Sequence, residues 1–233
     1  MVRLIGIFDS GIGGLTILAE IKKAIKHNNI IYYADSINNP YGDKNDKELK
    51  IITSKIVDFF IKENIKVIVI ACNTATTRCI TYLREKYPNI IFIGTEPAIK
   101  VACEKNHHNI LVLGTTATIN SFSVNKLIKT NKRDNQNIYL EACKGLANAI
   151  ETNNVSKIDD ILKKHMSKYE NIDSIVLGCT HYPYIKDKIK KYYPKAKVYD
   201  SSKGVAKELK RKLLENNILI NDGKQKVTII KNA

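Results

Sequence analysis

The sequence has no long hydrophobic run. Its longest uninterrupted apolar stretch is Val67–Cys72, far shorter than the roughly 20 residues that a membrane-spanning helix needs. Near the N-terminus the stretch between the charged residues Arg3 and Asp9 is only Leu4 to Phe8, which is too short for the apolar region of a signal peptide. The sequence therefore predicts no membrane segment, no secretory signal and a cytoplasmic location.

The cysteines do not form the even, closely spaced set of a disulfide-rich protein. There are five in 233 residues, so free thiols are expected rather than a disulfide framework. Cys179 and His181 form the closest Cys/His pair, and zinc sites need several closely spaced pairs, so no metal is expected. Cys79, Cys103 and Cys143 lie within helical or strand patterns and are assigned to packing.

Acidic residues are scarce relative to basic ones, with 23 Asp and Glu against 38 Lys and Arg and a formal net charge of +15. The lysines are spread along the whole chain, without the clustered arginines and interleaved aromatics of a nucleic-acid surface. A/T-rich codons for Lys, Ile and Asn would by themselves produce such a surplus. Because 44% of the residues are hydrophobic, a disordered polycation is excluded, and nucleic acid is not an expected partner.

Short β-branched segments alternate with helical patterns, which is typical of an α/β protein with mostly parallel sheets. The clearest helix is predicted over 47–63, with Asp46 as its cap. Four further helical patterns lie near 15–25, 80–87, 158–165 and 206–213. The predicted strands are 3–8, 30–34, 66–71, 90–94, 110–114, 137–141, 173–178, 196–200 and 226–230.

An internal repeat relates two parts of the chain. Residues 65–74 and 172–181 align without gaps, and each is a buried strand that ends in a small residue and then a cysteine. Upstream, strands that end at Asp9 and near Thr115 have similar spacings to Cys72 and Cys179. Two halves of similar plan are therefore predicted. Since ligands bind beyond the carboxyl ends of parallel strands, facing halves would place the two cysteines on opposite walls of one cleft.

Two polar loops follow predicted strands. The loop from Asp9 to Gly14 could present Ser10 and backbone N–H groups to a small anion at a helix N-terminus, or it could be an ordinary capped turn. The loop from Asp35 to Gly42 could hold Tyr41 at the mouth of a pocket, or it could be only a turn.

Cys72 and Cys179 each end a strand and precede a predicted helix, where N–H groups and the helix dipole lower the pKa of a thiol. Two-base proton transfer at a carbon acid is the chemistry that uses both thiols. A cysteine phosphatase is a rival, because Cys72 and Arg78 have the spacing of its phosphate loop, although that loop lacks glycine here. A basic anion-binding protein without catalysis is a further alternative.

Four segments, taken together, resemble the glutamate racemases of the cofactor-independent aspartate/glutamate racemase superfamily: Gly6–Leu15, Tyr33–Gly42, Ala71–Thr76 and Leu177–Pro183. The resemblance implies two α/β domains related by pseudo-twofold symmetry, each a mostly parallel sheet flanked by helices. The active site is expected in the cleft between them. Domain 1 would comprise 1–97 plus 206–233 and carry Cys72, and domain 2 would comprise 98–205 and carry Cys179.

The resemblance also implies roles for individual residues. Cys72 and Cys179 would be the catalytic acid/base thiols, assisted by Asp9 and His181 respectively. Glu151 keeps the spacing of an acidic residue that would assist His181, but the prolines usual before it are missing, so it stays outside the predicted site. The implied substrate contacts are Asp9, Ser10, Tyr41, Gly42, Asn73, Thr74, Thr180 and His181.

The function implied is the interconversion of L- and D-glutamate without a cofactor or a metal, supplying D-glutamate for peptidoglycan. Glutamate is the expected small-molecule partner, and a homodimer is left open. An aspartate racemase is the alternative within the superfamily. His181 favours glutamate, because aspartate racemases usually have Glu after the Cys-Thr pair.

Overall fold

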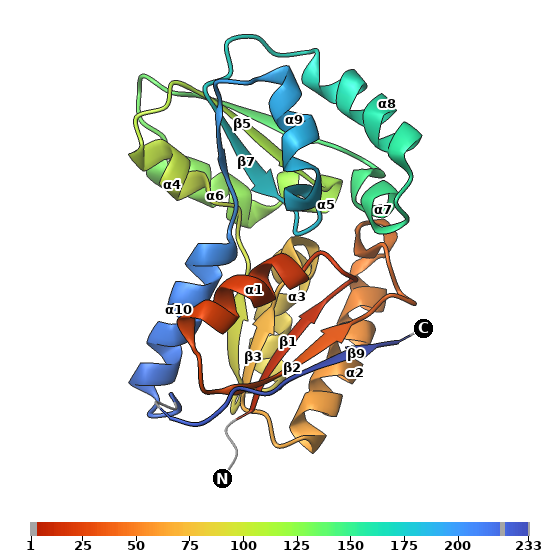
Figure 1. Ribbon diagram of the computed structural model, residues 1–233, viewed down its shortest axis with the longest axis vertical. Coiled ribbons are helices and arrows are strands. Elements are labelled where there is room, and N and C mark those ends of the chain that lie inside the picture. The colour runs from red at the N-terminus through yellow and green to blue at the C-terminus, as the bar shows by residue number, and fades with distance from the viewer. Residues whose placement is uncertain (1–3, 220–221, 233) are drawn as a thin grey trace. The chain divides into compact units, whose positions relative to one another are not determined.

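The computed structural model describes residues 4–219 and 222–232, and it divides into two compact units (Figure 1). The first unit combines the chain up to Thr95 with the chain from Ser202 onward, and the second unit runs from Glu96 to Ser201. The domain boundaries predicted from the sequence, after residues 97 and 205, lie a few residues further along the chain.

The first unit contains a five-stranded sheet in the order β4-β3-β1-β2-β9, and all of its strand pairs are parallel. Its strands are β1 (Leu4–Asp9), β2 (Asn29–Ala34), β3 (Val67–Ile70), β4 (Ile91–Gly94) and β9 (Val227–Lys231). Its helices are α1 (Leu15–Ala24), the short 3₁₀ helix η1 (Tyr41–Asp43), α2 (Asp46–Lys62), α3 (Asn73–Lys86) and α10 (Ser202–Glu215).

The second unit contains a four-stranded parallel sheet in the order β6-β5-β7-β8. Its strands are β5 (Asn109–Gly114), β6 (Asn137–Ala142), β7 (Ser174–Gly178) and β8 (Lys197–Tyr199). Its helices are α4 (Ile99–Glu104), α5 (Thr116–Ile119), α6 (Phe122–Asn131), α7 (Leu146–Glu151), α8 (Val155–Met166), the 3₁₀ helix η2 (Tyr182–Ile185) and α9 (Lys186–Tyr192).

These elements confirm the predicted α/β class with two parallel sheets flanked by helices. Each predicted strand is present, with ends that differ by at most one residue; residue 3, at the start of the predicted strand 3–8, lies outside the described residues. The five predicted helical patterns correspond to α1, α2, α3, α8 and α10, and the helix predicted after Cys179 corresponds to η2 and the adjoining α9, whereas α4 to α7 were not predicted. Within the described ranges, no helix is long and apolar enough to cross a membrane.

The two sheets share one topology, which confirms the two halves of similar plan. The order β4-β3-β1-β2 of the first sheet corresponds to β8-β7-β5-β6 of the second. In each unit the strand before the cysteine, β3 or β7, therefore pairs with the unit's first strand, β1 or β5. Cys72 thus follows a strand beside the one that ends at Asp9, and Cys179 follows a strand beside the one that precedes Thr115.

The inner strands β1, β3, β5 and β7 are buried on both faces, which explains why these strands are nearly continuous hydrophobic runs. Successive side chains alternate between faces, so that Ile7 packs in the core that contains α1 and α10, whereas Phe8 packs in the core that contains α2 and α3. In the second unit Leu113 shares a core with α7, α8 and α9, and Val112 shares one with α4 and α6. The strand ends are consequently held by packing on both sides.

The N-terminal cap of α2 differs from the prediction. Asn45, and not Asp46, is the cap residue, because its backbone is extended (φ −78°, ψ 170°) and its side chain accepts a hydrogen bond from the backbone N–H of Glu48. The Glu48 carboxylate accepts from the Asn45 N–H at 2.7 Å, which completes a capping box. Asp46 is the first helical residue, and its carboxylate pairs with Arg78.

The capping box gives a stability prediction. Asn45→Ala should lower the free energy of unfolding by about 1 kcal/mol, because it leaves helix N–H groups without an acceptor, whereas Asn45→Asp should be close to neutral because Asp caps equally well. Urea denaturation followed by circular dichroism measures both variants. Equal stabilities of the alanine and aspartate variants would contradict this assignment of the cap.

Candidate active site

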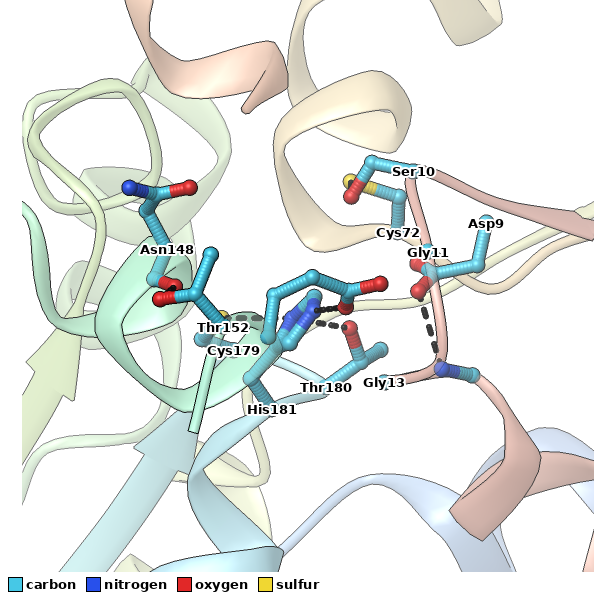
Figure 2. A network of polar contacts seen from close by, with 12 residues as sticks. Asp9, Ser10, Gly11, Gly13, Cys72, Asn148, Thr152, Cys179, Thr180 and His181 are labelled. Carbon is cyan, nitrogen blue, oxygen red and sulfur yellow. Dashed lines mark hydrogen bonds and ion pairs between the residues drawn. The ribbon is translucent and has the colours of Figure 1, made fainter. Parts of the chain in front are cut away.

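The loop between β1 and α1 holds the Asp9 carboxylate in place. Asp9 is fully buried, and the backbone N–H of Gly14 donates to its Oδ2 at 2.9 Å (Figure 2). The Tyr32 hydroxyl donates to the Gly11 carbonyl at 2.7 Å. A Cβ atom on residue 14 would lie 2.7 Å from the Tyr32 hydroxyl and 2.8 Å from Asp9 Cβ. Only glycine therefore allows this close approach of the loop to Asp9.

Cys72 is the N-cap residue of α3. It follows the buried strand β3 after one intervening residue, Ala71. The Ala75 N–H donates to its Sγ at 3.5 Å, and its thiol lies 3.9 Å from Ser10 Oγ. The parallel pairing of β1 and β3, with Phe8 opposite Ile70, brings Ser10 beside this thiol. Backbone N–H groups and the helix dipole at such a position favour the thiolate.

Asn73 and Thr74 form the first turn of α3, and both are buried. The Asn73 side-chain nitrogen donates to the Thr95 carbonyl at 3.3 Å. Its Oδ1 is buried without a hydrogen-bond partner among the described residues. Since buried polar atoms are normally paired, this oxygen is a candidate acceptor for a ligand N–H group.

Tyr41 and Gly42 lie in η1, in the loop that follows β2. The Tyr41 hydroxyl is buried and donates to Asp35 Oδ2 at 2.6 Å. Burial and the Asp35 carboxylate raise the pKa of Tyr41 well above its usual value, so the phenol stays neutral. The Asp35 N–H donates to the Asp9 carbonyl at 2.9 Å, and the loop therefore begins beside the end of β1.

In the second unit, Cys179, Thr180 and His181 follow β7 in one tight turn (Figure 2). The Cys179 Sγ lies 3.8 Å from Nδ1 of His181, and the Thr180 hydroxyl lies 3.5 Å from the same nitrogen. A Cβ atom on Gly178 would lie 2.8 Å from the Leu113 carbonyl oxygen. This glycine lets β7 approach β5 closely just before the cysteine.

Glu151 orients the His181 ring. Its Oε2 lies 2.6 Å from His181 Nε2, and both side chains are largely buried. Because Nε2 faces a carboxylate, the proton of the neutral ring resides there, and Nδ1 presents its lone pair to Cys179. The segment before Glu151 lacks the prolines that are usual in the family. In this segment Gly145 adopts a positive φ of 81° as the N-cap of α7, and Glu151 is the last residue of that helix. Glu151 was outside the predicted site, although its spacing was a signal for it.

The other three cysteines differ from Cys72 and Cys179. All five are free thiols, but Cys79, Cys103 and Cys143 are at most 1% exposed, compared with 6% for Cys72 and 7% for Cys179. Burial raises the pKa of all three, and it raises the pKa of Cys143 to about 12, with a smaller contribution from Glu141. These three thiols are therefore protonated core residues near neutral pH.

Arg78 does not serve the Cys72 loop, which argues against the phosphatase interpretation. Its guanidinium binds the Asp46 carboxylate and the Lys44 carbonyl at the start of α2. A phosphate loop needs its arginine turned towards the bound anion, so this alternative is not supported. In the part of the chain that the structure describes, no three His, Cys, Asp or Glu side chains gather as a metal-binding group.

Two parallel-sheet units, each with a thiol and a polar turn at the end of an inner strand, match a known class of α/β protein. The chain belongs to the Asp/Glu/Hydantoin racemase family, whose sequence model matches residues 15–209. Within that family it is similar to glutamate racemases. The glutamate racemase of Clostridium acetobutylicum is 40% identical over 232 residues, which cover 97% of this chain and 90% of the relative.

Solved structures agree with this assignment. The crystal structure of glutamate racemase isoform RacE1 from Bacillus anthracis superposes with a TM-score of 0.86 at 29% identity, covering 99% of this chain and 89% of that one. The glutamate racemase from Francisella tularensis, in complex with D-glutamate, has a TM-score of 0.84 at 31% identity, covering 100% and 89% of the two chains.

The exposures and pKa shifts predict which thiols react. Iodoacetamide at pH 8 should alkylate Cys72 and Cys179 first, because they keep some exposure and have donors nearby. Cys79, Cys103 and Cys143 should stay protected, because they are buried and their raised pKa values leave little thiolate. Peptide mass spectrometry locates the modified residues, and the urea-unfolded protein, in which all five should react, is the control. Labelling of Cys143 as fast as Cys72 would contradict this order.

Proposed function

We propose that the protein is a glutamate racemase that interconverts L- and D-glutamate by proton transfer at Cα. The observation that carries the proposal is the contact of the Cys179 thiol with one ring nitrogen of His181, while the other ring nitrogen contacts the Glu151 carboxylate. Its counterpart is the Cys72 thiol beside Ser10, at the end of a strand that pairs with the strand ending at Asp9. The high similarity to curated glutamate racemases supports this reaction for the chain.

The proposed mechanism uses the Cys72 thiol at one face of the substrate Cα and the Cys179 thiol at the other. A thiolate removes the Cα proton from one face, and the opposing thiol donates a proton to the other face, so that the configuration inverts. His181 Nδ1 accepts the Cys179 proton, and the Glu151 carboxylate stabilises the imidazolium that forms. Asp9 assists Cys72 in the other unit, as the family resemblance implies.

The substrate would be held by the buried polar groups at the strand ends. We propose that the hydroxyls of Ser10 and Thr180, the backbone N–H groups of Tyr41 and Gly42, and the N–H groups at the start of α3 donate to the two carboxylates of glutamate. The unpaired Oδ1 of Asn73 suits the substrate ammonium group. Asp9, Thr74 and His181 complete the proposed contacts. Such donors also stabilise the negative charge that develops as Cα loses its proton.

Several observations favour glutamate over aspartate. His181 stands at the position where aspartate racemases usually have Glu. Structures of similar racemases are described in complex with D-glutamate, for the Francisella tularensis enzyme, and with L-glutamate, for the Escherichia coli enzyme. The aspartate racemase from Picrophilus torridus shares only 16% identity with this chain, so its likeness concerns the fold alone.

We place the reaction in the cytoplasm, where it would supply D-glutamate for peptidoglycan. Five cysteines outside any disulfide are typical of a reducing compartment. In this proposal no imine cofactor delocalises the carbanion, so hydrogen-bond donors carry that stabilisation. The net charge of +15 gives a dianionic substrate a modest, salt-dependent attraction to the protein.

Isotope exchange tests the reaction itself. In D₂O, without added pyridoxal phosphate, the purified protein should exchange the Cα hydrogen of either enantiomer of glutamate, as followed by proton NMR, because each enantiomer is deprotonated during turnover. Aspartate is the comparison substrate and should exchange much more slowly. Absence of exchange with glutamate would overturn the proposed function.

Substitution of each thiol tests the two-base mechanism. Cys72→Ser and Cys179→Ser should each reduce kcat for racemisation by at least about 100-fold, because an alcohol is a far poorer proton acceptor than a thiolate. Cys79→Ala is the control, since Cys79 lies in α3, the helix that Cys72 caps, but is buried in the core. Near-normal turnover in either serine variant would exclude the two-thiol mechanism.

A further inference from the structure

The segment after β9 lies beside the proposed substrate loop of the first unit. β9 is the last strand along the chain, and it pairs in parallel with β2, with Ala34 opposite Lys231 (Figure 1). Because parallel strands end at the same edge of a sheet, the residue after β9 emerges beside the residue after β2. These two residues are Asn232 and Asp35, which are far apart in the sequence.

Asn232 contacts this loop through three of its atoms. Its backbone N–H donates to the Ala34 carbonyl at 3.3 Å, and its side-chain oxygen accepts from the Ile37 N–H at 3.4 Å. Its side-chain nitrogen donates to Oδ1 of Asp35. One amide therefore binds the backbone on one side of the loop and the Asp35 carboxylate on the other.

Asp35 in turn holds Tyr41. Asp35 is 1% exposed, and its carboxylate accepts from the Asn38 side chain at 2.9 and 3.1 Å and from the Tyr41 hydroxyl at 2.6 Å. Among residues 4–219 and 222–232, no Lys, Arg or His forms an ion pair with it. A buried carboxylate that rests on neutral donors loses much of its support when one donor is removed.

We infer that Asn232 is a positioning residue, which holds the Asp35 carboxylate so that the hydrogen bond from the Tyr41 hydroxyl to Asp35 keeps Tyr41 and the Gly42 backbone in the orientation needed to bind glutamate. The inference rests on the proposed function, because the contact between Tyr41 and the substrate is part of that proposal. Asn232 acts through Asp35 and does not itself touch the reacting atoms.

Gln225 provides a matched control for a purely structural role of the C-terminal strand. It precedes β9, as Asn232 follows it, and its side-chain nitrogen donates to the carbonyls of Ile25 and Asn28, the latter at 3.0 Å. Loss of either amide removes anchoring hydrogen bonds of the same strand. Only the loss of Asn232 would also release Asp35.

Steady-state kinetics separates the two roles. Asn232→Ala should raise KM for both enantiomers of glutamate about three- to tenfold and change kcat less than twofold, because the Tyr41–Gly42 loop that binds the substrate loses part of its anchoring while the thiols are untouched. Asn232→Asp should raise KM at least as much, since it places an oxygen against the Asp35 carboxylate. Gln225→Ala should leave KM unchanged. A normal KM in Asn232→Ala, or an equal rise in Gln225→Ala, would overturn the inference.

A double-mutant cycle tests whether the effect passes through Tyr41. In a Tyr41→Phe background, Asn232→Ala should change KM, and the glutamate Kd measured by calorimetry, less than twofold. If KM of the double variant rose by the product of the two single-variant factors, the inference would be overturned. The calorimetric Kd allows the same comparison even if the variants turn over slowly. Racemisation by the unsubstituted protein is measured first: its absence would overturn the proposed function, whereas an active protein with no Asn232 effect would overturn only the positioning role.

Discussion

The parallel pairing of inner strands is the constraint on which the site depends. In the first unit, the pairing of β1 with β3 brings Ser10 within 3.9 Å of the Cys72 thiol. In the second unit, β7 pairs with β5 and ends at Gly178, so that Cys179 leaves the sheet beside the end of β5. Because both faces of these inner strands are packed, the strand ends cannot shift without disturbing two cores.

Each unit then places neutral donors and largely buried carboxylates near its thiol, Asp9 and Asp35 in the first unit and Glu151 in the second. The Asp9 carboxylate accepts the Gly14 N–H, Asp35 accepts the Tyr41 hydroxyl, and Glu151 faces the His181 ring. No lysine is needed for these contacts, which separates the chemistry from the overall charge of +15. Buried carboxylates held by short hydrogen bonds keep their neighbours in fixed orientations, and such preorganisation is what proton transfer at a weak carbon acid requires.

Much of this arrangement was predictable from the sequence. The β-branched runs located every strand, and the repeat around Cys72 and Cys179 indicated the shared topology that the two sheets have. The helices α4, α5 and α7 were missed because each has too few turns to show a clear period, whereas α6 was missed although it is as long as α1. The cap of α2 was displaced by one residue, because Asn and Asp are both good caps and only the backbone conformation of Asn45 distinguishes them.

By itself, therefore, the sequence determined the elements, the α/β class and the two cysteine-bearing turns, since strand pattern and turn chemistry are local properties. Only the tertiary structure decided which distant side chains meet. Glu151 reaches His181 because Gly145 turns the chain into α7, and Asn232 reaches Asp35 because β9 pairs with β2. Contacts between residues so far apart depend on strand order and register, which arise from packing of the whole unit and leave no local pattern in the chain.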